Sequence, residues 1–220
     1  MKKILFLITI LPAMMSLTAC SDDDNPSDSI ELYDIVRLES VTEKGSVFTL
    51  CKPASDDEIT LVAPQIVNTK LVAEGERLLI MYVPNSGEAY RSGSVTLKGY
   101  GTIINGELKH GDDEDIDGWE SDPVYLLSAW RSGKYLNIHA RLQYGVKPQN
   151  FNLVMPEEQS GGKYPDLYLV YSRDADVTTF SRAYYASYDI SELVEDSDVE
   201  GFTLHLNNSN LKLDEIKFDK

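Results

Sequence analysis

The chain has 220 residues, 25% of them charged and 42% hydrophobic, with 36 acidic against 20 basic side chains and a formal net charge of −16. This composition is ordinary for a globular protein and excludes collagen, coiled coil or disorder as a description of the whole chain, while the length allows one large or two small domains. The acidic excess argues against binding to nucleic acid, which needs a net basic surface.

The N-terminus is a targeting signal that ends at a lipidation site. Lys2 and Lys3 precede an apolar stretch over residues 4–17, which is shorter than the roughly 20 residues that span a bilayer. The stretch ends in Leu-Thr-Ala-Cys20, which resembles the lipobox of bacterial lipoproteins. We therefore expect residues 1–19 to be removed and Cys20 to carry acyl chains that hold the protein on a membrane.

Residues 20–29 follow as a polar tether without an apolar side chain after the cysteine. Its Ser-Asp-Asp-Asp run resembles the acidic export signal that sends lipoproteins of gut and oral anaerobes to the outer face of the outer membrane. Asp28-Ser29-Ile30 resembles the O-glycosylation signal of the same bacteria, with Ser29 as the acceptor. A flexible acidic spacer is the alternative to both. The expected location is the outer membrane, facing the cell exterior.

Alternating apolar and polar residues predict about five strands in the first part of the mature chain. The expected strands span residues 32–41, 47–51, 59–63, 77–83 and 94–104. Cys51 falls in one of them and is interpreted as a small buried side chain. This number of strands is typical of a small closed barrel, so we predict an OB-like β-barrel domain over residues 30–110.

An acidic segment over residues 111–122 lacks apolar periodicity and is interpreted as the connection to a second domain, residues 123–220. Strands are expected there at 124–131, 135–144, 151–155, 167–172, 182–189, 201–206 and 211–218, with one short helix at 190–195. So many strands in so short a segment predict an antiparallel β-sandwich. The expected fold class is therefore all-β.

Several segments together resemble the NigD-like lipoproteins. They are the lipobox start, the Glu-Gly-Glu-Arg-Leu-Leu-Ile strand over 74–80, the Asp-Pro-Val restart at 122–124 and Lys-Tyr-Leu-Asn-Ile over 134–138. The resemblance implies an N-terminal OB-like barrel and a C-terminal β-sandwich. It also implies a bacteriocin-associated, immunity-type role, and it implies no catalytic residues.

The acidic connection contains Asp113, Asp115 and Asp117, followed by a glycine, in the spacing that begins a calcium loop. Ca²⁺ takes six to eight oxygen ligands, and alternate carboxylates supply several from one loop. Position twelve is Val124 instead of a glutamate, so an EF-hand is excluded. Two interpretations stay open, a looser Ca²⁺ site or a solvated acidic connection, and no other cofactor is expected.

The sequence lacks the motifs of a nucleophilic or zinc enzyme. His110, His139 and His205 are far apart in the chain, whereas a zinc site needs three or four converging ligands. Neither Gly-x-Ser-x-Gly nor His-Glu-x-x-His occurs. A pair of carboxylates for glycoside hydrolysis stays open among so many acids. We therefore predict a protein that is not an enzyme.

Thirteen tyrosines make up a large share of the aromatic residues, and Tyr184, Tyr185 and Tyr188 lie close together. Exposed tyrosines stack on sugar rings or anchor a protein partner, whereas buried ones fill a β-sheet core. Both interpretations stay open, and these three are the candidate ligand contacts.

The sequence thus predicts a non-catalytic, lipid-anchored cell-envelope protein that binds a protein or a glycan and no nucleic acid. The alternative is an enzyme or accessory subunit acting on envelope or dietary polysaccharide. A cleft with converging carboxylates would favour the enzyme, and an exposed aromatic patch would favour the binding protein.

Overall fold

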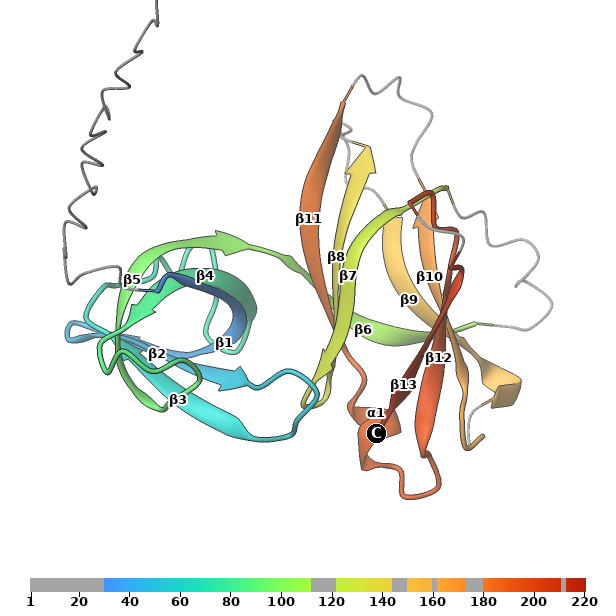
Figure 1. Ribbon diagram of the computed structural model, residues 1–220, viewed down its shortest axis with the longest axis horizontal. Helices are drawn as coiled ribbons and strands as arrows, with labels where there is room; N and C mark the ends of the chain where they lie inside the picture. Colours follow the sequence, from blue (N-terminus) through green and yellow to red (C-terminus); the bar gives the residue numbers. More distant parts are fainter. Residues whose placement is uncertain (1–29, 112–121, 144–149, 160–161, 173–179, 211–212) are drawn as a thin grey trace, which may run out of the picture.

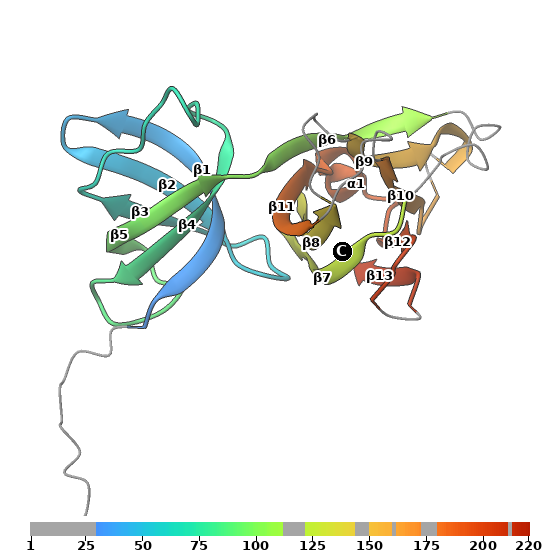
Figure 2. The same ribbon diagram turned by 90° about the horizontal axis from the view of Figure 1, so that it is seen from above.

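The computed structural model describes residues 30–111, 122–143, 150–159, 162–172, 180–210 and 213–220. Two β-rich units lie side by side, a barrel and a sandwich, and the chain passes from one to the other between β5 and β6 (Figures 1 and 2). The predicted all-β fold is confirmed, with a small closed barrel first and a sandwich second.

The barrel closes through the strand order β1-β2-β3-β5-β4. Its strands are β1 (Leu32–Thr42), β2 (Gly45–Cys51), β3 (Glu58–Ala63), β4 (Arg77–Pro84) and β5 (Gly93–Thr102). Successive side chains of each strand point alternately into and out of the barrel, and Val36, Phe48 and Ile80 point inward and are fully buried in its core. Gly45 makes the turn between β1 and β2 with φ +130°, and an added Cβ there would lie 2.0 Å from the Ala63 carbonyl oxygen.

The sandwich has the order β13-β12-β10-β9-β6-β11-β8-β7. Its elements are β6 (Ile104–Gly111), β7 (Tyr125–Ser132), β8 (Tyr135–Gln143), β9 (Asn150–Pro156), a 3₁₀ turn (Glu157–Gln159), β10 (Asp166–Ser172), β11 (Ser181–Asp189), α1 (Ser191–Glu195), β12 (Gly201–Leu206) and β13 (Glu215–Asp219). The first half of β6 pairs with β11 and its second half with β9, so β6 belongs to both layers.

The pairing inside the sandwich is mixed, whereas the sequence predicted an antiparallel arrangement. β6 runs parallel to both β9 and β11, and β10 runs parallel to β12. The reason is that β6 arrives from the barrel and lies between two strands that come later in the chain, so no hairpin joins it to either neighbour.

The end of the barrel also differs from the predicted boundary at residue 110. Residues 104–111 form β6 and pair only with sandwich strands, so the barrel strands end at Thr102. Alternation continues from β5 into β6 almost without a break, and alternation does not say which sheet a strand joins. Of the predicted connection, residues 112–121 lie outside the described residues.

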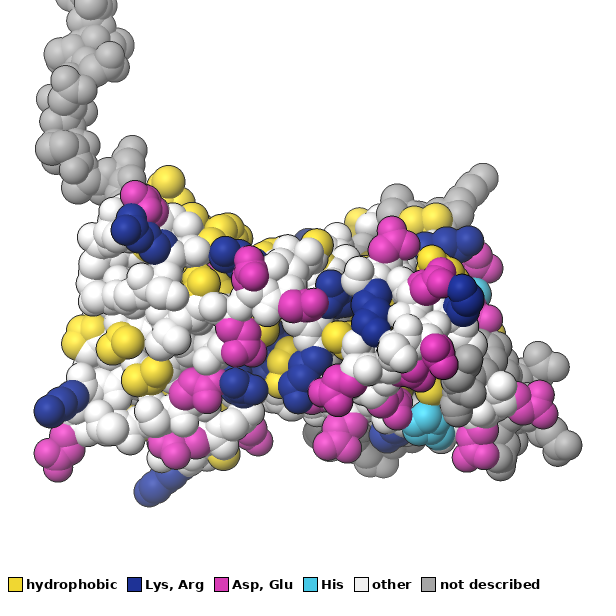
Figure 3. Space-filling model, turned by 90° about the horizontal axis from the view of Figure 1, so that it is seen from below, with side chains coloured by type: hydrophobic (Ala, Val, Ile, Leu, Met, Phe, Trp, Pro, Cys, Tyr) yellow, Lys and Arg dark blue, Asp and Glu magenta, His cyan; other side chains and the backbone are white. Residues whose placement is uncertain are grey.

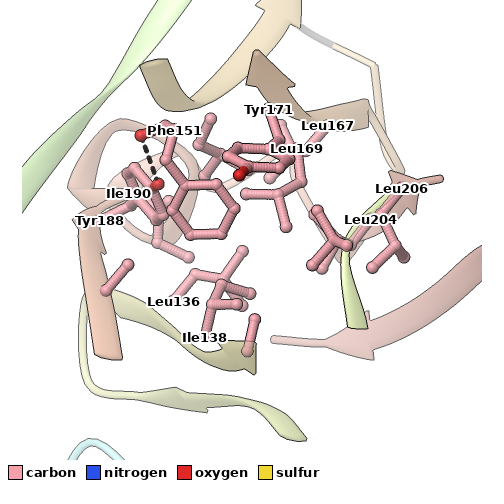
Figure 4. Close-up of a cluster of buried hydrophobic side chains, with 14 of the residues drawn as sticks. Leu136, Ile138, Phe151, Leu167, Leu169, Tyr171, Tyr188, Ile190, Leu204 and Leu206 are labelled. Carbon is pink, nitrogen blue, oxygen red and sulfur yellow. Dashed lines mark hydrogen bonds between the residues drawn. The ribbon is translucent and has the colours of Figure 1, made fainter. Parts of the chain in front are cut away.

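The core of the sandwich is formed by aliphatic side chains packed around aromatic rings, three of which are labelled in Figure 4. Phe151 meets Tyr171 edge to face with ring centroids 6.0 Å apart, and the hydroxyl of Tyr188 donates a hydrogen bond to the Phe151 carbonyl oxygen at 2.7 Å. Both tyrosine rings are almost completely buried. This core holds β8 and β11 in fixed register, and their outer side faces the barrel.

Candidate binding surface

The outer face of β8 and β11 is covered at one end and open at the other. Ser187 lies opposite Asn137 and Tyr185 lies opposite His139, so the two strands present paired side chains along one face. We call the part under the barrel, formed by Tyr135, Asn137 and Ser187, the near half. We call the open part, formed by Tyr125, His139, Arg141 and Tyr185, the far half. Figure 1 shows β8 and β11 continuing well past the barrel.

The near half receives Arg77 from β4 of the barrel. Its guanidinium Nη1 donates to Asn137 Oδ1 at 3.0 Å and to Ser187 Oγ, and Nη2 donates to the Ile35 carbonyl oxygen at 3.2 Å. The guanidinium carbon lies 3.9 Å from the ring centroid of Tyr135. Burial lowers the pKa of Arg77 to about 10, so the group stays charged at neutral pH. A buried cation with neutral hydrogen-bonding partners thus joins the barrel to the sandwich.

A second contact joins the barrel to the sandwich at the β2–β3 loop. The Ala54 amide donates to the Arg131 carbonyl oxygen, and the Gly133 amide donates to the Ser55 carbonyl oxygen, each at 2.8 Å. Arg131 Nη1 also reaches Asp56 Oδ1 at 2.6 Å. Figure 3, which shows the molecule from below, has Lys and Arg side chains next to Asp and Glu side chains where the barrel meets the sandwich. With two such contacts the barrel is fixed against the sandwich. The predicted burial of Cys51, which lies beneath Gly133, is confirmed.

A cleft of about 630 Å³ opens beside Arg77 at the junction and contains three carboxylates, Glu76, Glu107 and Asp189. Glu76 accepts a hydrogen bond from the Ala73 amide at 2.9 Å. Burial alone would raise the pKa of Asp189, but hydrogen bonds from Ser191 and the Lys134 ammonium outweigh it and lower that pKa. Asp189 is therefore held ionised by structural partners, which does not suit a general acid.

The far half is aromatic and carries a positive charge. The rings of His139 and Tyr185 stack with centroids 4.0 Å apart and planes 8° apart. Arg141 lies over the Tyr125 ring, 5.7 Å from its centroid. Burial and the charge of Arg141 lower the pKa of His139, so this imidazole is neutral at pH 7. Burial raises the pKa of Tyr185, and Tyr33 of β1, which is 60% exposed, adds to that shift.

Acidic side chains are rare on the three strands that form this face. β7 and β8 contain neither Asp nor Glu, and the one acid of β11, Asp189, lies at the junction end, 3.0 Å from Lys134 Nζ. In a chain with almost two acids for each base, this leaves the far half a neutral to positive surface on an acidic protein.

The structure separates the three tyrosines that the sequence grouped. Only Tyr185 lies on the far half. Tyr188 is 1% exposed and belongs to the core, which corrects its prediction as a ligand contact. Tyr184 is half-buried, packs against the same core and has Arg182 5.9 Å from its ring centroid. Because alternate side chains of a strand point to opposite faces of the sheet, residues 184 and 188 of β11 point toward the core, whereas residue 185 points outward.

Other predicted sites fall outside the described residues, namely Cys20, Ser29, Asp113, Asp115 and Asp117, and they stay predictions. The histidines do not converge: His110 pairs with Glu192 at 3.0 Å and His205 with Asp166 at 2.8 Å. Within the described ranges no group of three or more His, Cys, Asp or Glu side chains is placed to hold a metal ion.

Membrane-spanning helices are also absent from the described part of the chain, where no helix is long and apolar enough to cross a bilayer.

Sequence reasoning missed Arg77, Asn137, Ser187, Tyr125 and Arg141. A signal for Arg77 existed, because the strand Arg-Leu-Leu-Ile-Met-Tyr-Val is apolar on both faces, and such a strand is covered on both faces. At Arg77 the sandwich provides this cover, whereas the outward side chains further along β4 are half-buried. No comparable signal marks Arg141, whose exposure depends on how far the barrel reaches along β8.

Comparison with known proteins identifies the second unit. Residues 107–219 match the family model of the NigD-like C-terminal beta sandwich domain. No curated protein matches the chain.

Solved structures match over both units. A protein of unknown function from Bacteroides vulgatus has 19% identity and a TM-score of 0.70, covering 87% of this chain and 91% of its own. A candidate lipoprotein from Bacteroides fragilis has 15% identity and a TM-score of 0.57, covering 87% and 96%. A NigD-like immunity protein from Bacteroides caccae has 16% identity and a TM-score of 0.52, covering 85% and 91%. At these identities the likeness shows a shared two-unit fold.

Proposed function

The chain belongs to the NigD-like family, and from that premise we propose that it is a non-catalytic, lipid-anchored protein of the cell envelope that binds its partner through the far half. The observation that carries the proposal is the stacked His139–Tyr185 pair beside the cation–π pair of Arg141 and Tyr125, on a face that the barrel leaves open. The lipid on Cys20 would hold this face at the membrane, facing the exterior, with the polar tether as spacer.

The far half has the properties of a recognition surface. Tyrosine and arginine contribute most to binding energy at protein surfaces, because each presents a large contact area with a polar end. The two contacts at the junction fix the barrel, so Tyr33 keeps its place beside Tyr185 without a partner. A surface that is already ordered loses little entropy on binding.

A binding role also fits the chemistry of the face better than catalysis does. General acid–base catalysis needs a group that holds or accepts a proton near neutral pH. The described strands of the far half offer no carboxylate, and the imidazole of His139 is engaged in the stack with Tyr185. On the far half, these features support the binding protein over the enzyme. In the junction cleft, Asp189 is held ionised by Ser191 and Lys134 and does not suit a general acid.

Photo-crosslinking in living cells tests the proposal without knowledge of the partner. A benzophenone side chain replaces Tyr125 in one variant and Tyr100 of the barrel in the control, because these tyrosines are 40% and 37% exposed. We expect a discrete species of higher mass from position 125 and none from position 100. Crosslinking only from position 100, or from neither position, would contradict the proposal.

The anchor and its orientation are tested separately. Replacing Cys20 with Ser should release the protein from the membrane fraction. Proteinase K added to intact cells should degrade the wild-type chain while a periplasmic control protein survives. Survival of the chain in intact cells and its loss after lysis would overturn the outward orientation.

Immunity is a second candidate role, favoured by the neighbour from Bacteroides caccae, which is described as a NigD-like immunity protein. In that role the partner at the far half would be a protein toxin. Deleting the gene should then sensitise cells to a bacteriocin from a related strain, and variants of the far half should fail to restore resistance. Full restoration by those variants would refute the role.

A further inference from the structure

Two arginines of the described chain differ from the rest in having no carboxylate and no hydrogen-bonding partner from a side chain or a carbonyl. The other described arginines are Arg37, which pairs with Glu39, Arg91 with Glu88, Arg131 with Asp56, and Arg77 in the junction. The guanidinium groups of Arg141 and Arg182 instead lie over tyrosine rings. They project from opposite faces of the sheet, because Arg141 shares the outward parity of His139 and Arg182 lies opposite the inward Leu142.

Arg141 lines a pocket to which Arg182 does not contribute. The pocket has a volume of about 570 Å³ and is lined by Pro123, Tyr125, Arg141, Gln143, Ser181 and Ser209. Its walls come from the ends of three strands and from residue 209, whose amide donates to the Val124 carbonyl oxygen at 2.9 Å. Pockets of this size hold small ligands rather than flat protein surfaces.

The groups in the pocket define the chemistry of its ligand. The ring of Tyr125 offers a flat apolar surface, and this side chain is 40% exposed although Arg141 lies over the ring. Gln143, Ser181 and Ser209 are uncharged side chains with donor and acceptor atoms, which suits hydroxyl groups. Arg141 supplies one cation with a planar fork, which suits a single carboxylate.

We propose that this pocket binds a carboxylated sugar residue, a uronic acid within a glycan, with the carboxylate on Arg141 and the sugar ring against Tyr125. The proposal rests on the binding role of the far half and names its ligand class. An acidic peptide is the less suitable ligand, because it has neither a sugar ring for the tyrosine nor the hydroxyl groups that suit the neutral polar side chains.

Calorimetry on the mature chain from residue 20 onward tests the assignment with three probes. They are trigalacturonate, its fully methyl-esterified form, which keeps the rings and loses the charges, and a short poly-glutamate peptide. We expect saturable binding of trigalacturonate and at least about ten-fold weaker binding of the ester. Equal binding of the ester, stronger binding of the peptide, or no binding of trigalacturonate at about 10 mM would each overturn the proposal.

Matched variants locate the site. Arg141→Gln and Tyr125→Ala should each weaken trigalacturonate binding about ten-fold or more, whereas Arg182→Gln should change it less than about two-fold. Because Arg182 is also an arginine stacked on a tyrosine at the same end of the sheet, an equal loss in both arginine variants would show a diffuse charge effect and contradict the pocket. Crosslinking from position 125 together with no uronate binding would refute this inference and leave the binding role in place.

Discussion

The near and far halves of one sheet face show how the same strands serve two purposes. In the near half an arginine from the barrel is buried against Asn137, Ser187 and the Tyr135 ring. In the far half an arginine of the sheet itself, Arg141, lies in the open over the Tyr125 ring. Both pairings are cation–π contacts on β-strands, so residue type alone does not separate the structural pair from the binding pair.

The two pairs differ because Arg77 and Tyr135 lie where the barrel meets the sandwich, whereas the barrel leaves Arg141 and Tyr125 uncovered. Once buried, Arg77 needs hydrogen bonds for its guanidinium, and the asparagine and serine of the near half supply them, although Nε is left without a partner. Arg141 stays solvated and needs no protein partner. The comparison predicts large stability effects in the near half, and small stability effects with a loss of binding in the far half.

Removing the junction arginine should have the largest effect. Arg77→Met leaves Asn137 Oδ1, Ser187 and the Ile35 carbonyl short of a donor in a buried site, so we expect a loss of about 3 kcal/mol in the free energy of unfolding. Urea denaturation measures it. The exposed pair of Arg91 and Glu88 provides the control, because Arg91→Met should cost under about 0.5 kcal/mol. Equal effects would contradict the structural role of the near half.

A carboxyl on β1 of the barrel extends the comparison to pH. Burial raises the pKa of Asp34 from its usual 3.8 to about 6, although a hydrogen bond from Tyr82 opposes the shift. A raised pKa means that stability is highest below pH 4 and falls as the pH rises to about 6. Because Asp34 is partly exposed, we expect Asp34→Asn to be more stable than the wild type by about 1–2 kcal/mol at pH 8.

Thermal or urea unfolding of both chains at pH 4 and pH 8 measures this effect. The two chains should differ much less at pH 4, where the aspartate is mostly protonated in the folded state and roughly half protonated in the unfolded state. A variant that is less stable than the wild type at pH 8 would show that ionised Asp34 stabilises the fold.

Two neighbouring tyrosines sharpen the contrast between core and surface. Tyr188→Phe removes a buried hydrogen bond to the Phe151 carbonyl and should cost about 1–1.5 kcal/mol without affecting binding. Tyr185→Phe keeps the ring stack on His139 and should change stability by under about 0.5 kcal/mol. Chemical denaturation and the crosslinking assay distinguish them. A larger stability loss in Tyr185→Phe would reverse the assignment of the two residues.

The smallest effect concerns the charge of Arg141. Burial and this cation lower the pKa of His139, so Arg141→Gln should raise that pKa, as measured by NMR titration of the imidazole. Since a lowered histidine pKa weakens the fold as the pH falls below 6.5, the variant should also lose less stability on acidification. Arg182→Gln is the control and should leave the His139 titration unchanged. No shift in either variant would show that Arg141 does not act on His139.

The sequence predicted the fold class because alternation and turn residues are local signals, and the strand positions follow from them. It misplaced the barrel boundary because β5 and β6 share one alternation pattern while pairing in different sheets. Among the residues of the site, the sequence predicted Tyr185. It also selected Tyr188, because that residue lies nearby in the sequence, but the side chain of Tyr188 points to the other face of β11 and is buried in the core. Arg141 lies opposite Tyr125 because a bulge in β7 shifts the register of the β7–β8 hairpin, and alternation does not reveal that bulge.

Radical footprinting of tyrosine side chains, on intact cells and on the purified mature chain, tests the central claim most directly. Tyr125 and Tyr185 should react less in cells, where the partner is present, than in the purified protein. Tyr100, whose exposed fraction of 37% is close to the 40% of Tyr125, should react equally in both. Equal reactivity of Tyr125 in cells and in solution, or protection confined to Tyr100, would contradict the far half as the binding surface.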